Sequence, residues 1–115
     1  MPSILYKIVG EHEWLAAAAE GRFIGSAVDL DDGFIHFSTA GQVAETAARH
    51  FAGRKGLVLV AVEAAALGAA LKWEPSRGGA LFPHLYDVLD LKAVRRVVPL
   101  PVGEDGAHLF PELDV

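Results

Sequence analysis

Two histidines in strand-like segments are the residues of this sequence best suited to chemistry at a small-ligand site. His36 lies in DGFIHFST, residues 32 to 39, and His84 lies in LFPHLY, residues 81 to 86. Side chains alternate between the two faces of a strand, so each histidine shares its face with an aromatic side chain and a hydroxyl-bearing one. Those neighbours are Phe34 and Ser38 for the first segment and Phe82 and Tyr86 for the second.

An apolar wall with a few placed hydrogen-bonding groups is the usual composition of a small-ligand site. We therefore expect His36, His84 and Tyr86 to line one cleft as the candidate catalytic residues. The structural alternative carries equal weight at this point, because a histidine in an apolar strand is as often a partly buried residue whose ring nitrogens bond to backbone or water.

Four further residues are candidates for substrate binding. Ser38 and Thr39 end the first segment, although both also have an explanation as helix caps. Glu74 lies in LKWE, and Arg77 lies in the glycine-containing loop PSRGG. A guanidinium flanked by glycines is suited to binding a phosphate or carboxylate through two hydrogen bonds. We expect no metal site, since His36, His84 and Glu74 lack the short spacing of a preformed metal-binding motif.

The elements that must position these residues are two helices and several short strands. A β-branched run predicts a strand over residues 4 to 9, and acidic residues followed by alanines predict a helix over 11 to 20 that ends at Gly21. DGFIHF reads as a strand. Thr39 and Gln42 form a capping box for a second helix over residues 40 to 52.

The second half of the chain is dominated by predicted strands. Residues 56 to 63, GLVLVAVE, form the most continuous apolar run and predict a central strand buried on both faces. LKWE, LFPHLY and VRRVVPL are three further strands, and Pro83 favours an edge strand or one bordering a cleft. Helices early and strands late indicate an α+β domain with mostly antiparallel strands.

Composition limits the classes of protein to which this chain can belong. A length of 115 residues predicts a single domain over residues 1 to 115. A formal net charge of −5 argues against general nucleic-acid binding. The chain has no cysteine, which fits a reducing compartment. No apolar run approaches the ~20 residues that span a membrane, so we expect a cytoplasmic protein without a membrane partner.

The combination of DGFIHFST with Gln42, LKWEPSRGG, LFPHLYDVLDL and VRRVVPL resembles the family catalogued as domain of unknown function 952. That family is similar, more remotely, to the ADP-ribosyltransferase fold, in which a split α+β domain binds NAD in a cleft between two small sheets. The resemblance implies that His36 orients a ribose hydroxyl of NAD, that Ser38 lies beside it, and that Tyr86 stacks on nicotinamide.

This sequence departs from transferases that use a catalytic glutamate on a late strand. Its late candidates are Glu104 and Glu112, and neither lies in a predicted strand. Two classes of function therefore remain open. The first is an enzyme that acts on NAD, an ADP-ribosylated compound or a phosphorylated nucleotide. The second is a non-catalytic domain that binds a nucleotide or another small metabolite in the same cleft.

Overall fold

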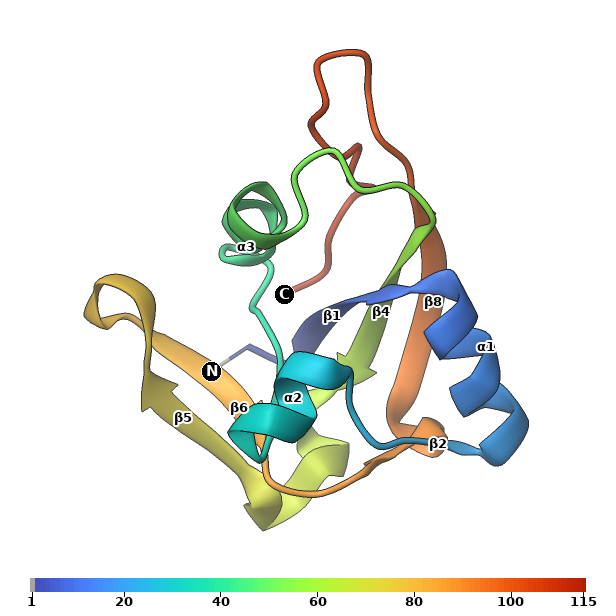
Figure 1. The fold of residues 1–115 in the computed structure, drawn as a ribbon. Helices are drawn as coiled ribbons and strands as arrows, with labels where there is room; N and C mark the ends of the chain where they lie inside the picture. The colour runs from blue at the N-terminus through green and yellow to red at the C-terminus, as the bar shows by residue number, and fades with distance from the viewer. Residues whose placement is uncertain (1) are drawn as a thin grey trace.

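The chain folds around a three-stranded antiparallel sheet. The computed structural model describes residues 2 to 115, apart from the side chain of Arg77. Strand β4 (Leu57–Glu63) lies between β1 (Ile4–Gly10) and β8 (Val94–Leu100), and it pairs antiparallel with both. Alternate residues of β4 enter two different hydrophobic clusters, which confirms the predicted central strand buried on both faces (Figure 1).

A second three-stranded antiparallel sheet carries the candidate site. Its order is β3 (Ile35–His36), β6 (Leu81–Leu85) and β5 (Leu71–Pro75). The edge-strand prediction for Pro83 is wrong, because β6 is the middle strand. The carbonyl of Pro83 accepts from the Phe37 N–H, just beyond the two-residue pairing of β6 with β3. The nitrogen and the carbonyl of one residue in an antiparallel strand point to the same side, so the Pro83 nitrogen also faces Phe37 and not β5. No ladder bond to β5 is lost.

Two helices match the predicted ones in position. Helix α1 (Glu11–Glu20) ends at Gly21, whose φ of 78° is the left-handed conformation that favours glycine. Helix α3 (Val43–His50) is shorter than the predicted 40 to 52. Residues 40 to 42 form a turn in which the Thr39 carbonyl accepts from both Gln42 and Val43 N–H groups. The Gln42 side chain accepts from the Thr39 N–H at 3.1 Å, so that half of the predicted capping box is present before the helix.

Sequence patterns missed a short helix directly before the first histidine. Helix α2 (Ala27–Asp32) precedes the segment predicted as a strand and shares only Asp32 with it, and of that predicted strand only β3 is formed. Asp29 at its N3 position accepts from the Ser26 N–H at 2.9 Å and from the Ser26 hydroxyl at 3.0 Å. This Ser-x-x-Asp pattern is a helix start, and it explains why residues 27 to 32 form a helix and not an irregular connection.

The remaining elements are short. Strand β2 (Arg22–Phe23) pairs with β7 (Leu89–Asp90), and 3-10 segments η1 (Ala64–Ala70), η2 (Arg77–Gly79) and η3 (Leu91–Ala93) connect the late strands. The α+β class with antiparallel sheets is thus confirmed. Among the described residues, no helix is long and apolar enough to cross a membrane.

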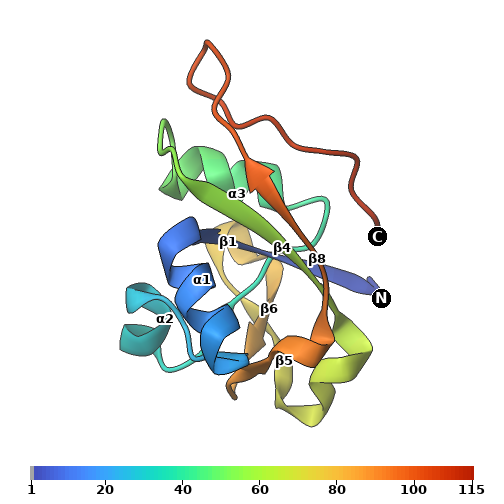
Figure 2. The same ribbon diagram turned by 90° about the vertical axis from the view of Figure 1, so that its right-hand side faces the viewer.

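The three-stranded sheet β1-β4-β8 has a hydrophobic cluster on each face. One cluster joins it to α1 and to the second sheet through Trp14, Phe37 and Leu85. The other lies beneath α3 and includes Val43 and Phe110, the latter from the C-terminal segment that runs back along the molecule (Figure 2). The side chains on the two faces of strand β1 therefore pack into the two different clusters. This packing fixes the position of Lys7 at the candidate site.

Candidate functional site: a cleft with two histidine–carboxylate pairs

His36 and His84 are direct cross-strand partners in the β3–β6 pair. Their ring centroids lie 5.5 Å apart with the rings nearly edge to face. The ring of Phe34 lies against both, with centroid distances of 4.5 Å to His36 and 4.1 Å to His84. Phe34 also contacts the ring of Tyr86 at 5.2 Å. The predicted alternation of side chains therefore brings these four rings to one face of the second sheet.

Two carboxylates hold the His36 ring, one at each nitrogen. Nδ1 lies 2.6 Å from Oδ1 of Asp29, and Nε2 lies 2.9 Å from Oδ2 of Asp32. Asp29 is buried, with 1% of its side chain exposed, whereas Asp32 is 48% exposed at the end of α2. His36 itself is 34% exposed. One end of the ring is thus fixed in the interior and the other faces the solvent-accessible side.

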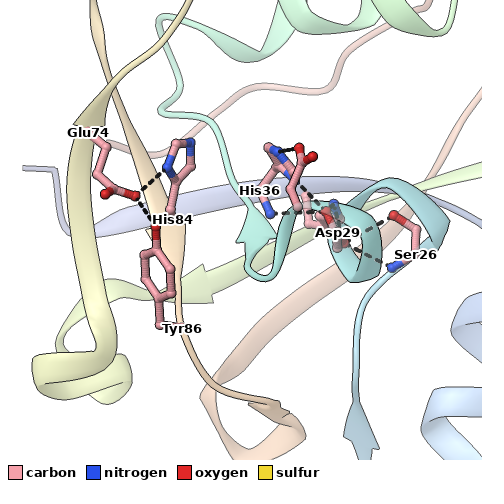
Figure 3. A network of polar contacts seen from close by, with 8 residues as sticks. Ser26, Asp29, His36, Glu74, His84 and Tyr86 are labelled. Atoms are coloured by element: carbon pink, nitrogen blue, oxygen red, sulfur yellow. Dashed lines mark hydrogen bonds and ion pairs between the residues drawn. The ribbon is translucent and has the colours of Figure 1, made fainter.

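Asp29 is the centre of a buried polar network (Figure 3). Besides Ser26 and the His36 ring, it accepts from the His36 N–H at 3.1 Å and binds the Lys7 ammonium at 2.9 and 3.0 Å. Burial by itself raises the pKa of Asp29, but the hydrogen bond from His36 and the Lys7 charge outweigh it and hold the pKa well below its ordinary value. Burial lowers the pKa of Lys7, and Asp29 opposes that change.

Glu74 holds the second histidine. Its Oε1 lies 2.8 Å from Nδ1 of His84 and accepts from the Tyr86 hydroxyl at 2.7 Å. The hydrogen bond from Tyr86, followed by that from His84, lowers the pKa of Glu74. The same bond to Glu74 raises the pKa of Tyr86. In Figure 3 this group lies across from the His36 group, so the two imidazoles stand between two separate carboxylate systems.

The two histidines open on a cleft of about 620 Å³. Residues of β1 and β3 line it together with α2 and α3, and Ser76, Phe82 and His84 close another side. Five basic side chains line it: they are Lys7, His36, His50, Arg54 and His84. Three of the five histidines of the chain therefore meet in one cavity.

The predicted site residues are only partly brought together. His36, His84 and Ser38 line the cleft. Tyr86 and Glu74 do not line it but lie behind His84, where they fix its ring. Ser38 bonds to the Thr46 hydroxyl at 2.9 Å.

The structure does not place the other two predicted binding residues, Thr39 and Arg77, in the cleft. Thr39 borders a different, shallow hollow of about 460 Å³ beside both chain ends. The predicted role of Arg77 depends on a side chain that lies outside the described residues. The neighbouring Ser76 lines the cleft, so the PSRGG loop does reach the site.

Sequence reasoning missed Lys7, Asp29 and Asp32. Two of them carried a readable signal. Lys7 is the one charged residue inside the apolar run ILYKIV, and such a charge in a buried strand requires a partner. Asp29 completes the Ser-x-x-Asp helix start. Among the described residues, no group of three or more His, Cys, Asp or Glu side chains could hold a metal ion. The expected absence of a metal stays a prediction.

The fold and the paired histidines define a small α+β protein with a cleft that residues of both three-stranded sheets line. The model of the family described as proteins of unknown function (DUF952) matches residues 8–97, and the chain belongs to this family. The proposed likeness to ADP-ribosyltransferases has no counterpart in these comparisons.

Three solved structures of protein CC0527 from Caulobacter crescentus are similar to the chain. A crystal structure has 55% identity and a TM-score of 0.90, and the alignment covers 93% of this chain and 94% of that one. A solution NMR structure has 57% identity and a TM-score of 0.82, with 90% of each chain covered. No curated protein matches the chain.

Proposed function

We propose that the cleft binds a nucleotide and that the protein processes NAD, an ADP-ribosylated compound or a phosphorylated nucleotide, with His36 orienting the ribose. One observation carries the proposal: His36 and His84 face each other in a cleft, and a carboxylate fixes the Nδ1 side of each ring. An imidazole held in this way presents its Nε2 edge in one orientation, which is what positioning a reactive sugar requires.

The dimensions and charge of the cleft support a nucleotide. Its volume of about 620 Å³ lies within the range of small-molecule sites, roughly 300 to 1,000 Å³. Phe37, Phe51 and Phe82 provide apolar lining, and Arg54 provides positive charge for a phosphate. The resemblance to the ADP-ribosyltransferase fold adds support of another kind, because it also places a ligand between two small sheets.

His36 has a defined role in this proposal. Cleavage of the nicotinamide–ribose bond develops positive charge on the sugar and depends on how the ribose is oriented. A ribose hydroxyl at Nε2 of His36 takes the place that the exposed Asp32 carboxylate occupies, while Asp29 keeps the ring in position. Tyr86 lies behind His84 and bonds to Glu74, which favours a positioning role over the stacking role that the resemblance implies.

A second candidate is a non-catalytic nucleotide-binding or metabolite-binding domain. The acidic side chains among those lining the cleft are Glu13 and Asp32, and neither Glu104 nor Glu112 is among them. A glutamate in the usual place for transferase chemistry is thus missing from the lining. Mass spectrometry of NAD incubated with the protein tests catalysis on NAD, since free nicotinamide forms only if the protein cleaves the nicotinamide–ribose bond.

Binding itself is tested by thermal denaturation with NAD, ADP-ribose, AMP and free adenine. A ligand that binds only the native state at 100 times its Kd stabilises that state by about 2.7 kcal/mol, which raises the melting temperature by several degrees. We expect a rise with the three ribose phosphates and none with adenine. No rise with any ribose phosphate contradicts the proposal.

A further inference from the structure

We propose that His84 is the general base and His36 the general acid of an enzyme that hydrolyses a small ribose phosphodiester in the cleft. The inference rests on the proposed function, from which it takes a nucleotide as ligand. It adds the class of bond and the role of each histidine. Both roles follow from which ring nitrogens are already bonded to carboxylates.

His36 is held with a proton on each nitrogen. An ionised carboxylate can only accept hydrogen bonds, and each nitrogen of the His36 ring lies within 2.9 Å of one, so both nitrogens donate. A ring that donates from both nitrogens is an imidazolium. The His36 backbone N–H also bonds to Asp29, which fixes the ring relative to that carboxylate. His36 therefore has a proton to give.

The charges around His36 agree with this state. Asp29 and Asp32 carry two negative charges and Lys7 carries one positive charge, so a cationic His36 makes the group of four neutral. Asp29 is already paired with Lys7, so a neutral His36 would leave the half-exposed Asp32 carboxylate without a cationic partner. An opposite charge beside both carboxylates favours the protonated ring.

His84 has the opposite arrangement. Its Nδ1 donates to Glu74 at 2.8 Å, and among the described residues no carboxylate bonds to its Nε2. The charge of Glu74 is shared with the Tyr86 hydroxyl, which donates to the same oxygen. A cationic His36 ring 5.5 Å away disfavours a second cation. His84 is therefore neutral with a free lone pair on Nε2, which makes it a base.

Two neighbouring imidazoles in opposite states suit a displacement in which one oxygen must lose a proton and another must gain one. Hydrolysis of a ribose 2′,3′-cyclic phosphate has this requirement. The Nε2 atom of His84 removes a proton from water, and the water oxygen forms a bond to phosphorus. The bond from phosphorus to one ribose oxygen breaks, and Nε2 of His36 protonates that oxygen.

The product of this step is a nucleoside monophosphate, and one water is consumed. His84 ends as the cation and His36 as the neutral ring, and proton exchange with solvent restores both. Asp32 must leave Nε2 of His36 before the transfer, which its exposed place at the end of α2 allows. Arg54 lines the same cleft and can neutralise the phosphate.

The protonation states are tested without any ligand by NMR of protein labelled with ¹⁵N in its histidines. At neutral pH we expect His36 to show two protonated ring nitrogens and His84 to show one, on Nδ1. The variants His36→Asn and His84→Asn assign the signals, because asparagine keeps a donor at the position of Nδ1 and lacks Nε2. The same state for both rings, or reversed states, overturns the inference.

Turnover is tested with adenosine 2′,3′-cyclic monophosphate. We expect hydrolysis, and we expect each asparagine variant to lower kcat/KM by about 10²-fold or more. His12→Asn, on the exposed side of α1, is the matched control and leaves the rate unchanged. Binding without hydrolysis overturns the inference and leaves the proposed function standing, whereas absence of binding by this probe and by the nucleotides named above removes both.

The pH profile of kcat/KM is a third readout. It should be bell-shaped, because uptake of a proton by His84 stops the reaction at low pH and loss of one by His36 stops it at high pH. A profile with a single limb contradicts the division of roles. The groups that face the two rings, and that the profile therefore also reflects, are Lys7 from β1, Asp29 and Asp32 from α2, Glu74 from β5, and Tyr86 after β6.

Discussion

His36 and His84 lie opposite each other in adjacent strands, with ring centroids 5.5 Å apart, and yet they bond to different carboxylates. Asp29 reaches the first ring from a helix, and Glu74 reaches the second from the neighbouring strand β5. The two rings therefore share one cleft while their environments can be changed separately. A substitution at one of these carboxylates should therefore affect mainly the histidine to which it bonds.

Asp29 is expected to be the residue whose loss destabilises the protein most among the polar groups of the site. Asp29→Ala leaves the buried Lys7 ammonium without its counter-charge, so the free energy of unfolding should fall by about 3 to 5 kcal/mol. Urea denaturation measures this change. The exposed neighbour Asp31 is the control, and Asp31→Ala should change stability by less than about 0.5 kcal/mol. Equal effects of the two substitutions would contradict a central role for Asp29.

Stability should fall in acid because of Asp29. The pKa of Asp29 is lower in the folded protein than in the unfolded chain, where it is about 3.9. The stabilisation is therefore complete above the unfolded value and is lost as pH falls below it towards the folded value. Urea denaturation at a series of pH values should show a steeper decline below about pH 4 in the wild type than in Asp29→Asn. Parallel declines would show that Asp29 is not the source.

Tyr86 should titrate above its ordinary range because it donates to the charged Glu74. Ultraviolet absorbance during alkaline titration measures tyrosine ionisation, and the difference between the wild type and Tyr86→Phe isolates this residue. In Glu74→Gln the acceptor is neutral, so the pKa of Tyr86 should move down towards its ordinary value of about 10. An unchanged titration in Glu74→Gln would mean that the bond does not persist in solution.

Tyr86 should act on the site through Glu74 and not by touching the ligand. Tyr86→Phe removes one donor from Glu74, so the pKa of Glu74 should rise towards its ordinary value. NMR titration of the Glu74 carboxyl carbon measures that rise. Nucleotide affinity should change less in Tyr86→Phe than in His84→Asn, because Tyr86 does not line the cleft. The reverse order of affinities would return Tyr86 to the stacking role.

The sequence predicted the pairing of the two histidines better than the network that holds them. Alternation along a strand depends only on local geometry, so the shared face of Phe34 and His36 was readable even though β3 has two residues. The ion pair between Lys7 and Asp29 depends on how α2 packs against β1, and no local sequence pattern specifies that contact. The middle position of β6 was missed for a related reason, since the effect of Pro83 depends on where its partner strand ends.

The central claim is that His36 orients a nucleotide in the cleft, and paired measurements on His36→Asn test it most directly. His36→Ala would remove a donor from buried Asp29 and destabilise the protein by about 1 to 3 kcal/mol, which would obscure the comparison. Asparagine keeps that donor and removes Nε2. Calorimetric titration with ADP-ribose and thermal denaturation of the same sample should show binding lost or greatly weakened and a melting temperature close to that of the wild type. Unchanged affinity with a large fall in melting temperature would make His36 a structural residue and contradict the account.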